Sequence, residues 1–282
     1  METAITETAW DTGPGSLVKR LRRLVGRRET IRYLVQANLK AGHRNKALGN
    51  LWNLLDPAAS LAIYYLVFGV WLNQARGGAT EYLIYLFTGV VAWRFLDGAL
   101  AQSVNCIRSN RGLISEINFP KAVFPLSICF SRLYDFLWGL LVLLAALLIA
   151  GRPPSWYALW MLPLIAVQLI MTVGLAYIVA YLGAFFADMA NIMSVVLRLG
   201  FYASPILYYV QGPHATRIPP KYLAIYMLNP FAGLLESYRA VLTQHRPLDP
   251  WHVLYVLGVS LALLIVGYGL FSRGEGKFAK YV

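Results

Sequence analysis

The chain is poor in charged side chains and in cysteine. Of its 282 residues only 13% are Asp, Glu, Lys or Arg, against about 25% in a soluble domain, and 58% are hydrophobic. The two cysteines, Cys106 and Cys129, are too few for a disulfide framework and lack metal-ligand spacing. The composition therefore excludes a soluble domain and indicates a polytopic membrane protein.

The sequence also lacks a nucleotide-binding loop. The nearest glycine–lysine pair, Gly276-Lys277, has neither the preceding glycine spacing nor the following Ser or Thr of a P-loop. If the chain belongs to an ATP-driven pump, ATP and Mg must be bound by a partner subunit, and we expect no cofactor in this chain. An ion-coupled carrier or a membrane enzyme would show the same absence.

The formal net charge is +12, but the basic residues lie between the hydrophobic runs and at the two ends. This placement fits membrane lipid headgroups and the positive-inside rule better than nucleic acid. Residues 1–16 contain acids and no apolar core, so we expect a disordered tail there and no cleavable signal.

Hydrophobic runs long enough to cross a bilayer recur along residues 49–272. A span needs about 20 mostly apolar residues. A short, only mildly polar break at 185–191 separates the fourth and fifth runs, and without it the count would be five. The six candidate spans are 51–72, 82–105, 123–150, 157–183, 192–211 and 251–271.

The distribution of positive charge favours six spans. Residues 17–46 hold ten Lys or Arg against one acid, Glu29, and the basic tail 273–282 holds three. Both ends therefore prefer the cytoplasm, which requires an even number of spans. We predict an all-α, six-span protein of the bacterial plasma membrane with both termini in the cytoplasm.

Residues 17–48 precede the first span and have apolar side chains at helical spacing, with Lys and Arg on the other face. The pattern predicts an amphipathic interface helix. It either anchors the topology or forms a cytoplasmic collar that helps admit a lipid-linked substrate.

Two stretches near the start resemble one known family. In KAGHRNKALGNLWNLLDP, residues 40–57, the Leu-Gly, Trp and Pro match the start of the first span in type-2 ATP-binding-cassette exporter permeases for cell-surface polysaccharides and teichoic acids. Asp56 stands where Asn is common in that family. The stretch NRGLISEINFPKAVFPLS, residues 110–127, resembles the cytoplasmic coupling segment of these permeases.

Two later stretches continue the resemblance. FFAD at 185–188, followed by SPILYY at 204–209, is similar to a family pattern, although Ala187 replaces a common Arg. Asn229-Pro230 resembles the start of the family's re-entrant helices before the last span. The resemblance implies a homodimer with two ATP-binding-cassette ATPase subunits docked on the cytoplasmic side.

The predicted coupling segment, 107–121, carries apolar residues that a loop in water would not need. They recur at roughly helical spacing and are able to fill a groove on a partner, or to dip into the headgroups. The resemblance favours ATPase coupling by Leu113, Ile114, Glu116, Ile117 and Phe119.

Charged residues inside spans cost about 2.5–3.5 kcal/mol each on insertion scales. Arg94 and Asp97 are three residues apart in the second span, and so are Arg132 and Asp135 in the third. Each pair shares a helical face and is able to neutralise itself. The pairs either brace the helices or bring an arginine to the pyrophosphate of a lipid carrier.

Aromatic residues cluster in the first and fifth spans. Rings with polar edges hold sugars weakly enough for a polymer to slide, although an interfacial aromatic belt explains some of them. The family lines its channel with these two spans. The predicted substrate path comprises Tyr64, Tyr65, Phe68, Trp71, Phe201, Tyr202 and Tyr208.

The segment 221–242 is predicted to form two short helices at the outer mouth. The second helix has a good start and an apolar face, but about 15 helical residues cover only about 22 Å of a core of about 30 Å. We expect it to dip in as an exit gate. The gate residues are Asn229, Pro230, Phe231, Leu234, and the pair Glu236 and Arg239, expected to rearrange in water.

The sequence thus predicts a permease that exports a polyprenyl-diphosphate-linked polymer, teichoic acid or O-antigen, and is not itself an enzyme. A drug or small-lipid exporter of the same fold is the alternative within transport. An integral-membrane polyprenyl-phosphate transferase is the alternative from another class. That enzyme would need a clustered acidic metal site such as D-x-x-D, which the sequence lacks.

Overall fold

The computed structural model describes residues 28–43, 51–67, 79–112, 120–209 and 228–278, and within these ranges every regular element is a helix. The helices are α2 (Arg28–His43), α3 (Trp52–Tyr64), α4 (Ala79–Ser103), α5 (Cys106–Ser109), α7 (Val123–Ile149), the 3-10 helix η3 (Trp156–Trp160), α8 (Met161–Phe185), α9 (Met189–Ala203), α11 (Pro230–Leu242) and α12 (Pro250–Gly274).

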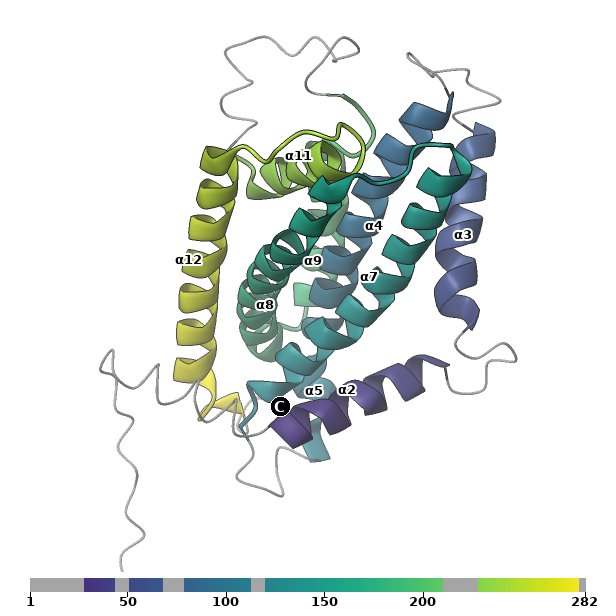
Figure 1. Cartoon of the computed structure of the whole chain (residues 1–282). Helices are drawn as coiled ribbons and strands as arrows, with labels where there is room; N and C mark the ends of the chain where they lie inside the picture. Colours follow the sequence, from purple (N-terminus) through teal and green to yellow (C-terminus); the bar gives the residue numbers. More distant parts are fainter. Residues whose placement is uncertain (1–27, 44–50, 68–78, 113–119, 210–227, 279–282) are drawn as a thin grey trace, which may run out of the picture.

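The long helices α4, α7, α8 and α12 stand roughly side by side (Figure 1). Helix α2 lies across one end of this bundle, and α11 lies across the opposite end. The last turn of α12 lies at the same end as α2, as an even number of crossings requires.

In the described part of the chain four helices are long and apolar enough to cross a membrane, and they match the predicted second, third, fourth and sixth spans. Their bounds are Thr80–Ser103, Val123–Ile149, Trp156–Phe185 and Pro250–Gly274. The predicted first and fifth spans correspond to the shorter helices α3 and α9. The count of six therefore stays a prediction.

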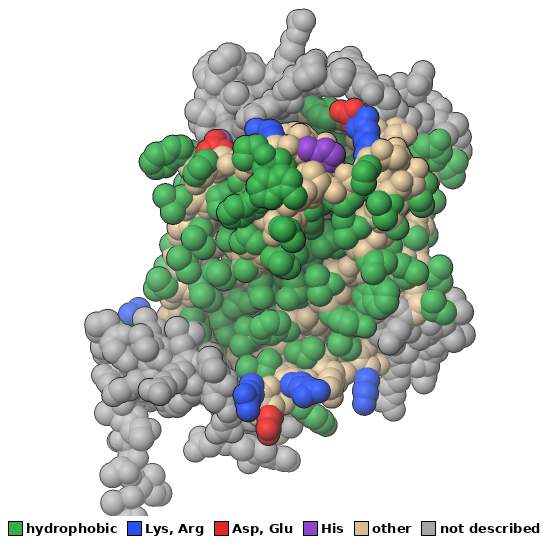
Figure 2. All heavy atoms as spheres, in the orientation of Figure 1, with side chains coloured by type: hydrophobic (Ala, Val, Ile, Leu, Met, Phe, Trp, Pro, Cys, Tyr) green, Lys and Arg blue, Asp and Glu red, His purple; other side chains and the backbone are tan. Residues whose placement is uncertain are grey.

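The surface has the layering that a bilayer demands. Figure 2 shows hydrophobic side chains over the middle of one face, with the charged side chains gathered toward its two ends. In water such a band would be a large exposed apolar patch, whereas acyl chains cover it at no cost.

Helices α8 and α9 are separate, but α9 is shorter than the predicted span 192–211. It ends at Ala203 because Ser204, which precedes Pro205, adopts an extended conformation (ψ 150°). Two tyrosines of α4 hydrogen-bond to backbone carbonyls of the segment that follows α9. The hydroxyl of Tyr82 donates to Leu207 O at 2.8 Å, and that of Tyr85 lies 2.7 Å from Tyr208 O and 3.4 Å from Pro205 O. Within the described residues the predicted fifth span, 192–211, is therefore α-helical only as far as Ala203, and its crossing of the membrane stays a prediction.

Helix α2 occupies the middle of the predicted interface helix 17–48. It packs against α7, with Ile31 and Leu34 facing the core and the Asn38 amide donating to Ser127 Oγ at 3.4 Å. The apolar stripe seen in the sequence is thus covered, at least in this part, by the start of a neighbouring helix.

Helices α8 and α12 touch backbone to backbone through two glycines. A Cβ atom on Gly267 would lie 2.1 Å from the carbonyl oxygen of Gly174, and one on Gly174 would lie 2.6 Å from the backbone at Leu263. Small residues are what allow such an approach between membrane helices.

We expect Gly267→Ala to destabilise the protein by about 1–3 kcal/mol, because the added methyl group must force the two helices apart. Gly269→Ala on the same helix is the matched control, since a Cβ there meets nothing within 4 Å. Thermal unfolding in detergent compares the two variants. Equal stability would show that the glycine contact does not fix this helix pair.

Candidate functional site

A polar cavity of 720 Å³ lies between α2, α3, α4 and α7. It brings together the second- and third-span charges singled out in the sequence and adds a carboxylate from α3. Its charged lining residues are Asp56, Arg94, Asp97, Arg132 and Asp135.

Arg94 pairs with a different helix from the one predicted. Its Nη2 atom lies 2.6 Å from Asp56 Oδ2 on α3, and Nη1 donates to Ser60 Oγ at 3.3 Å. The spacing made Asp97 able to neutralise Arg94 within α4, but the acid that forms the ion pair comes from the neighbouring helix. The sequence held one signal, the Asp at position 56 where the family commonly has Asn.

Arg132 does form its predicted pair, with Nη1 lying 3.1 Å from Asp135 Oδ2. Its Nε also donates to Gln102 Oε1 on α4 at 3.2 Å. The side chain lies across Gly98, where an added Cβ would come within 3.3 Å of Arg132 Cδ. Arg94 thus joins α3 to α4, and Arg132 joins α4 to α7.

The predicted aromatic path is exposed in part. Tyr65, the residue after α3, is 45% exposed, and Tyr202 on α9 is 61% exposed. Tyr64, Phe201 and Tyr208 are half-buried, and both helices pack against α4. Phe68 and Trp71 lie outside the described residues.

The predicted start of the outer helix is confirmed. The side chain of Asn229 accepts from Phe231 N at 3.0 Å, and Pro230 occupies the first turn of α11. The apolar face is buried as expected, but burial extends all round the helix. Every residue from Phe231 to Leu242 is buried except Glu236, because α12, α4, α8 and η3 surround the helix.

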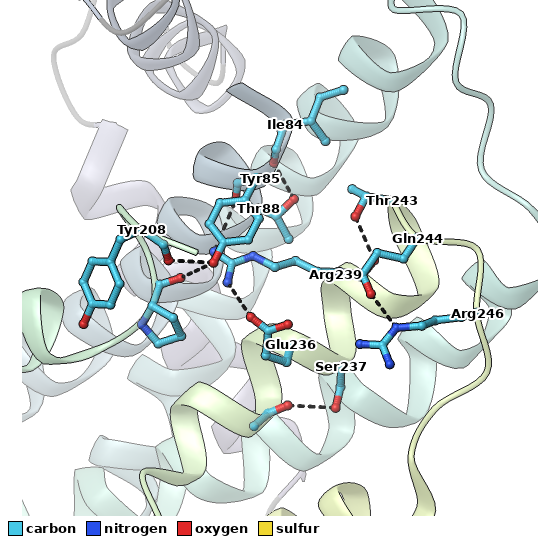
Figure 3. Close-up of polar contacts among 12 residues, drawn as sticks. Ile84, Tyr85, Thr88, Tyr208, Glu236, Ser237, Arg239, Thr243, Gln244 and Arg246 are labelled. Atoms are coloured by element: carbon cyan, nitrogen blue, oxygen red, sulfur yellow. Dashed lines mark hydrogen bonds and ion pairs between the residues drawn. The ribbon is translucent and has the colours of Figure 1, made fainter. Parts of the chain in front are cut away.

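Among the described residues Arg239 is the largest fully buried side chain, and Figure 3 shows its polar contacts. Its guanidinium carbon lies 3.3 Å from the centroid of the Tyr85 ring, and Nη2 donates to Tyr85 O at 3.3 Å. Nη1 pairs with Glu236 Oε1 at 3.1 Å, and Gly89 leaves the space that Nη2 occupies. The pair was expected to rearrange in water. Instead it is buried and joins α11 to α4.

A second polar chain holds α11. The hydroxyl of Tyr238 donates to Gln168 Oε1 at 2.8 Å, and the Gln168 amide donates to Ala92 O at 2.8 Å. Both side chains are buried and out of contact with water. These hydrogen bonds therefore satisfy polar groups that would otherwise have no partner. The sequence pattern gave no signal for Tyr85, Gly89 or Gln168.

The residues on either side of the predicted docking residues 113–119 are anchored. On one side, Cys106 and Ile107 of α5 are buried. On the other side, the Lys121 backbone N–H donates to Glu275 Oε1 at 2.6 Å, and its ammonium donates to Glu275 O at 2.9 Å. Burial lowers the pKa of Lys121, and the Glu275 charge opposes that shift. The coupling residues 113–119 themselves lie outside the described residues.

Comparison with known proteins agrees with this architecture. The family model described as ABC-2 type transporter matches residues 29–243, which includes the cavity and α11. The chain belongs to the ABC-2 type transporter family. Within the family it is a multi-pass membrane permease, consistent with the resemblance found in its sequence.

The chain is similar over most of its length to curated ABC-2 permeases. It is 29% identical over 266 residues to the O-antigen export system permease protein RfbA of Myxococcus xanthus, covering 94% of this chain and 100% of that protein. It is 30% identical to RfbA of Klebsiella pneumoniae, covering 88% and 92%. It is 22% identical to the polysialic acid transport protein KpsM of Escherichia coli, covering 81% and 86%.

In this ABC-2 permease we expect Arg239→Met to be destabilising by about 3–5 kcal/mol, because it leaves the Glu236 carboxylate unpaired in a protein interior. Adding Glu236→Gln should recover part of the loss by removing that charge. Arg246→Met, at an exposed position just beyond α11, is the control. The measurement is thermal unfolding in detergent, and an Arg239→Met variant as stable as the control would contradict the buried clamp.

Proposed function

We propose that this chain is the permease of an exporter that moves a cell-surface polysaccharide of O-antigen type, linked to a polyprenyl diphosphate, across the bacterial plasma membrane. The observation that carries the proposal is the alignment along 94% of the chain with a protein named as an O-antigen export permease. The polysialic acid transport protein extends the likeness to a second polysaccharide system. These relatives favour a glycan over teichoic acid, a drug or a small lipid.

Energy comes from ATP hydrolysed by a separate subunit, with two ATPases on a permease homodimer. The family match supports an ATPase partner. Leu113, Ile114, Glu116, Ile117 and Phe119 dock it on the cytoplasmic side. The anchored residues on either side support this role. Lys121 is bonded to Glu275 at the end of α12, and α5, which holds Ile107, packs against α8, so a displacement of 113–119 would be transmitted to these two helices.

The polymer passes between two copies of the chain along α3 and α9. These helices pack on α4 and carry apolar side chains at their surface, such as Ile63, 58% exposed, and Leu199, 64% exposed. Tyr65 and Tyr202 present rings beside them. A wall of this kind contacts sugar C–H faces weakly and repeatedly, which suits a sliding chain.

Helix α11 is a fixed part of the outer mouth and not a gate that swings. Opening it would pull the Arg239 charge from Tyr85 and Glu236 and expose the hydrogen bonds of Tyr238. A buried charge stripped of its partners is far more costly than a displaced apolar side chain. Leu234, 1% exposed, is likewise enclosed within its own chain.

Deletion of the gene should remove the glycan from the cell surface and leave carrier-linked polymer inside the cell. Sugar analysis of intact cells and of the lipid fraction measures both pools. Complementation with the intact gene is the control. A deletion strain with normal surface glycan would contradict the proposed function.

Ile117→Asp with Phe119→Asp should release the ATPase during co-purification, because two carboxylates cannot enter an apolar groove. Ser109→Asp, which adds a charge at an exposed site within 107–121 but before the docking residues 113–119, is the matched control. The permease alone should show no ATPase activity. Unchanged co-purification of the double variant would assign residues 113–119 to the lipid headgroups instead.

A further inference from the structure

We infer that the cavity between α2, α3, α4 and α7 binds sugar residues of the polymer and not the diphosphate of its carrier. The inference rests on the proposed function for the identity of the polymer. It begins from one residue, Arg94, which is the only exposed residue of α4 between Tyr82 and Leu100. A guanidinium facing lipid at this depth is unfavourable, so this opening faces water or a polar ligand.

The balance of charge disfavours a diphosphate. Three carboxylates, from Asp56, Asp97 and Asp135, meet two guanidiniums in the cavity. Each guanidinium already holds a carboxylate, Arg94 at 2.6 Å and Arg132 at 3.1 Å. A diphosphate would have to displace these acids and then remain beside them, and like charges brought together are repelled.

A metal ion does not fit the three carboxylates either. They do not come close enough to share one, and no other group of three His, Cys, Asp or Glu in the described part of the chain does so. The acids are therefore hydrogen-bond acceptors, and two of them, Asp56 and Asp135, are held in place by the arginines.

Sugar hydroxyls suit this lining because each of them donates and accepts. The carboxylates accept, while the guanidiniums and the amides of Asn38 and Gln102 donate. Asn53 also lines the cavity, and its Nδ2 atom is a buried donor that has no acceptor among the described atoms.

The cavity also offers an apolar plane and enough room. Trp52, 44% exposed, lines it, and an indole ring is a side chain on which the C–H face of a sugar ring packs. The volume of 720 Å³ lies within the range of about 300–1,000 Å³ typical of ligand sites. The same helix continues to Tyr64 and Tyr65, so a sugar leaving the cavity along α3 meets the proposed polymer path.

The test uses a cysteine reporter at the rim, Ala41→Cys, in the full chain reconstituted in lipid nanodiscs. Both native cysteines are buried, so a polar maleimide should label only the reporter. The probes are the glycan released by mild acid from the surface polysaccharide of the source bacterium, and inorganic pyrophosphate at matched ionic strength. Glycan at about four times its Kd should slow labelling about fivefold, whereas pyrophosphate should leave the rate unchanged.

Trp52→Ala in the reporter chain should abolish the protection by glycan. Trp251→Ala is the matched control, since this tryptophan is 79% exposed on α12, outside the cavity lining, and should preserve it. Protection by pyrophosphate and not by glycan would assign the cavity to the carrier and overturn the inference. Protection by neither probe would make the charges a helix brace and would also overturn it.

The deletion strain separates this inference from the proposed function. If the surface glycan is lost on deletion while the purified chain shows no protection, only the cavity assignment fails. If the glycan persists on the deletion strain, the proposed function itself fails, whatever the labelling rates.

Discussion

A charged side chain at membrane depth is stable only where groups of the protein, or enclosed water, replace bulk solvent. This constraint shapes the surroundings of α4. Toward one end of the bundle, Arg239 extends from α11 to α4. It contacts Tyr85 and Glu236, and Gly89 leaves room for its guanidinium. Toward the other end, Arg94 projects from α4 to Asp56 of α3. Arg239 thus ties together two helices that are far apart in sequence, and Arg94 ties together two consecutive ones.

The two arginines differ in access, and this difference separates structural from functional roles. Arg239 is fully buried, so no substrate reaches it and its contacts hold α11 in place. The side chain of Arg94 is 46% exposed in a cavity that also exposes Asp56. One arginine, Arg239, therefore stabilises the packing of α11, whereas the other, Arg94, remains accessible to a polar ligand in the cavity.

The sequence was sufficient for the features that depend on local pattern. Hydropathy located four of the spans, the Asn-Pro pair located the start of α11, and i,i+3 spacing found Arg132 with Asp135. It failed where a partner came from elsewhere in the chain. Arg239 bonds to Tyr85, 154 residues away, and Arg94 pairs across helices, so neither contact is encoded in the periodicity of one segment. The early end of α9 was signalled by Pro205 and overlooked because the flanking residues are apolar.

The glycine contact between α8 and α12 limits how the permease is able to change shape. The two backbones come this close only where Gly174 and Gly267 lie opposite each other, because a Cβ atom at either position would clash with the facing backbone. Neither helix can turn about its own axis or slide past the other without a steric clash. The two helices therefore form a single rigid strut, and a transport cycle must tilt this strut as a whole, with the hinge placed where it meets the remaining helices.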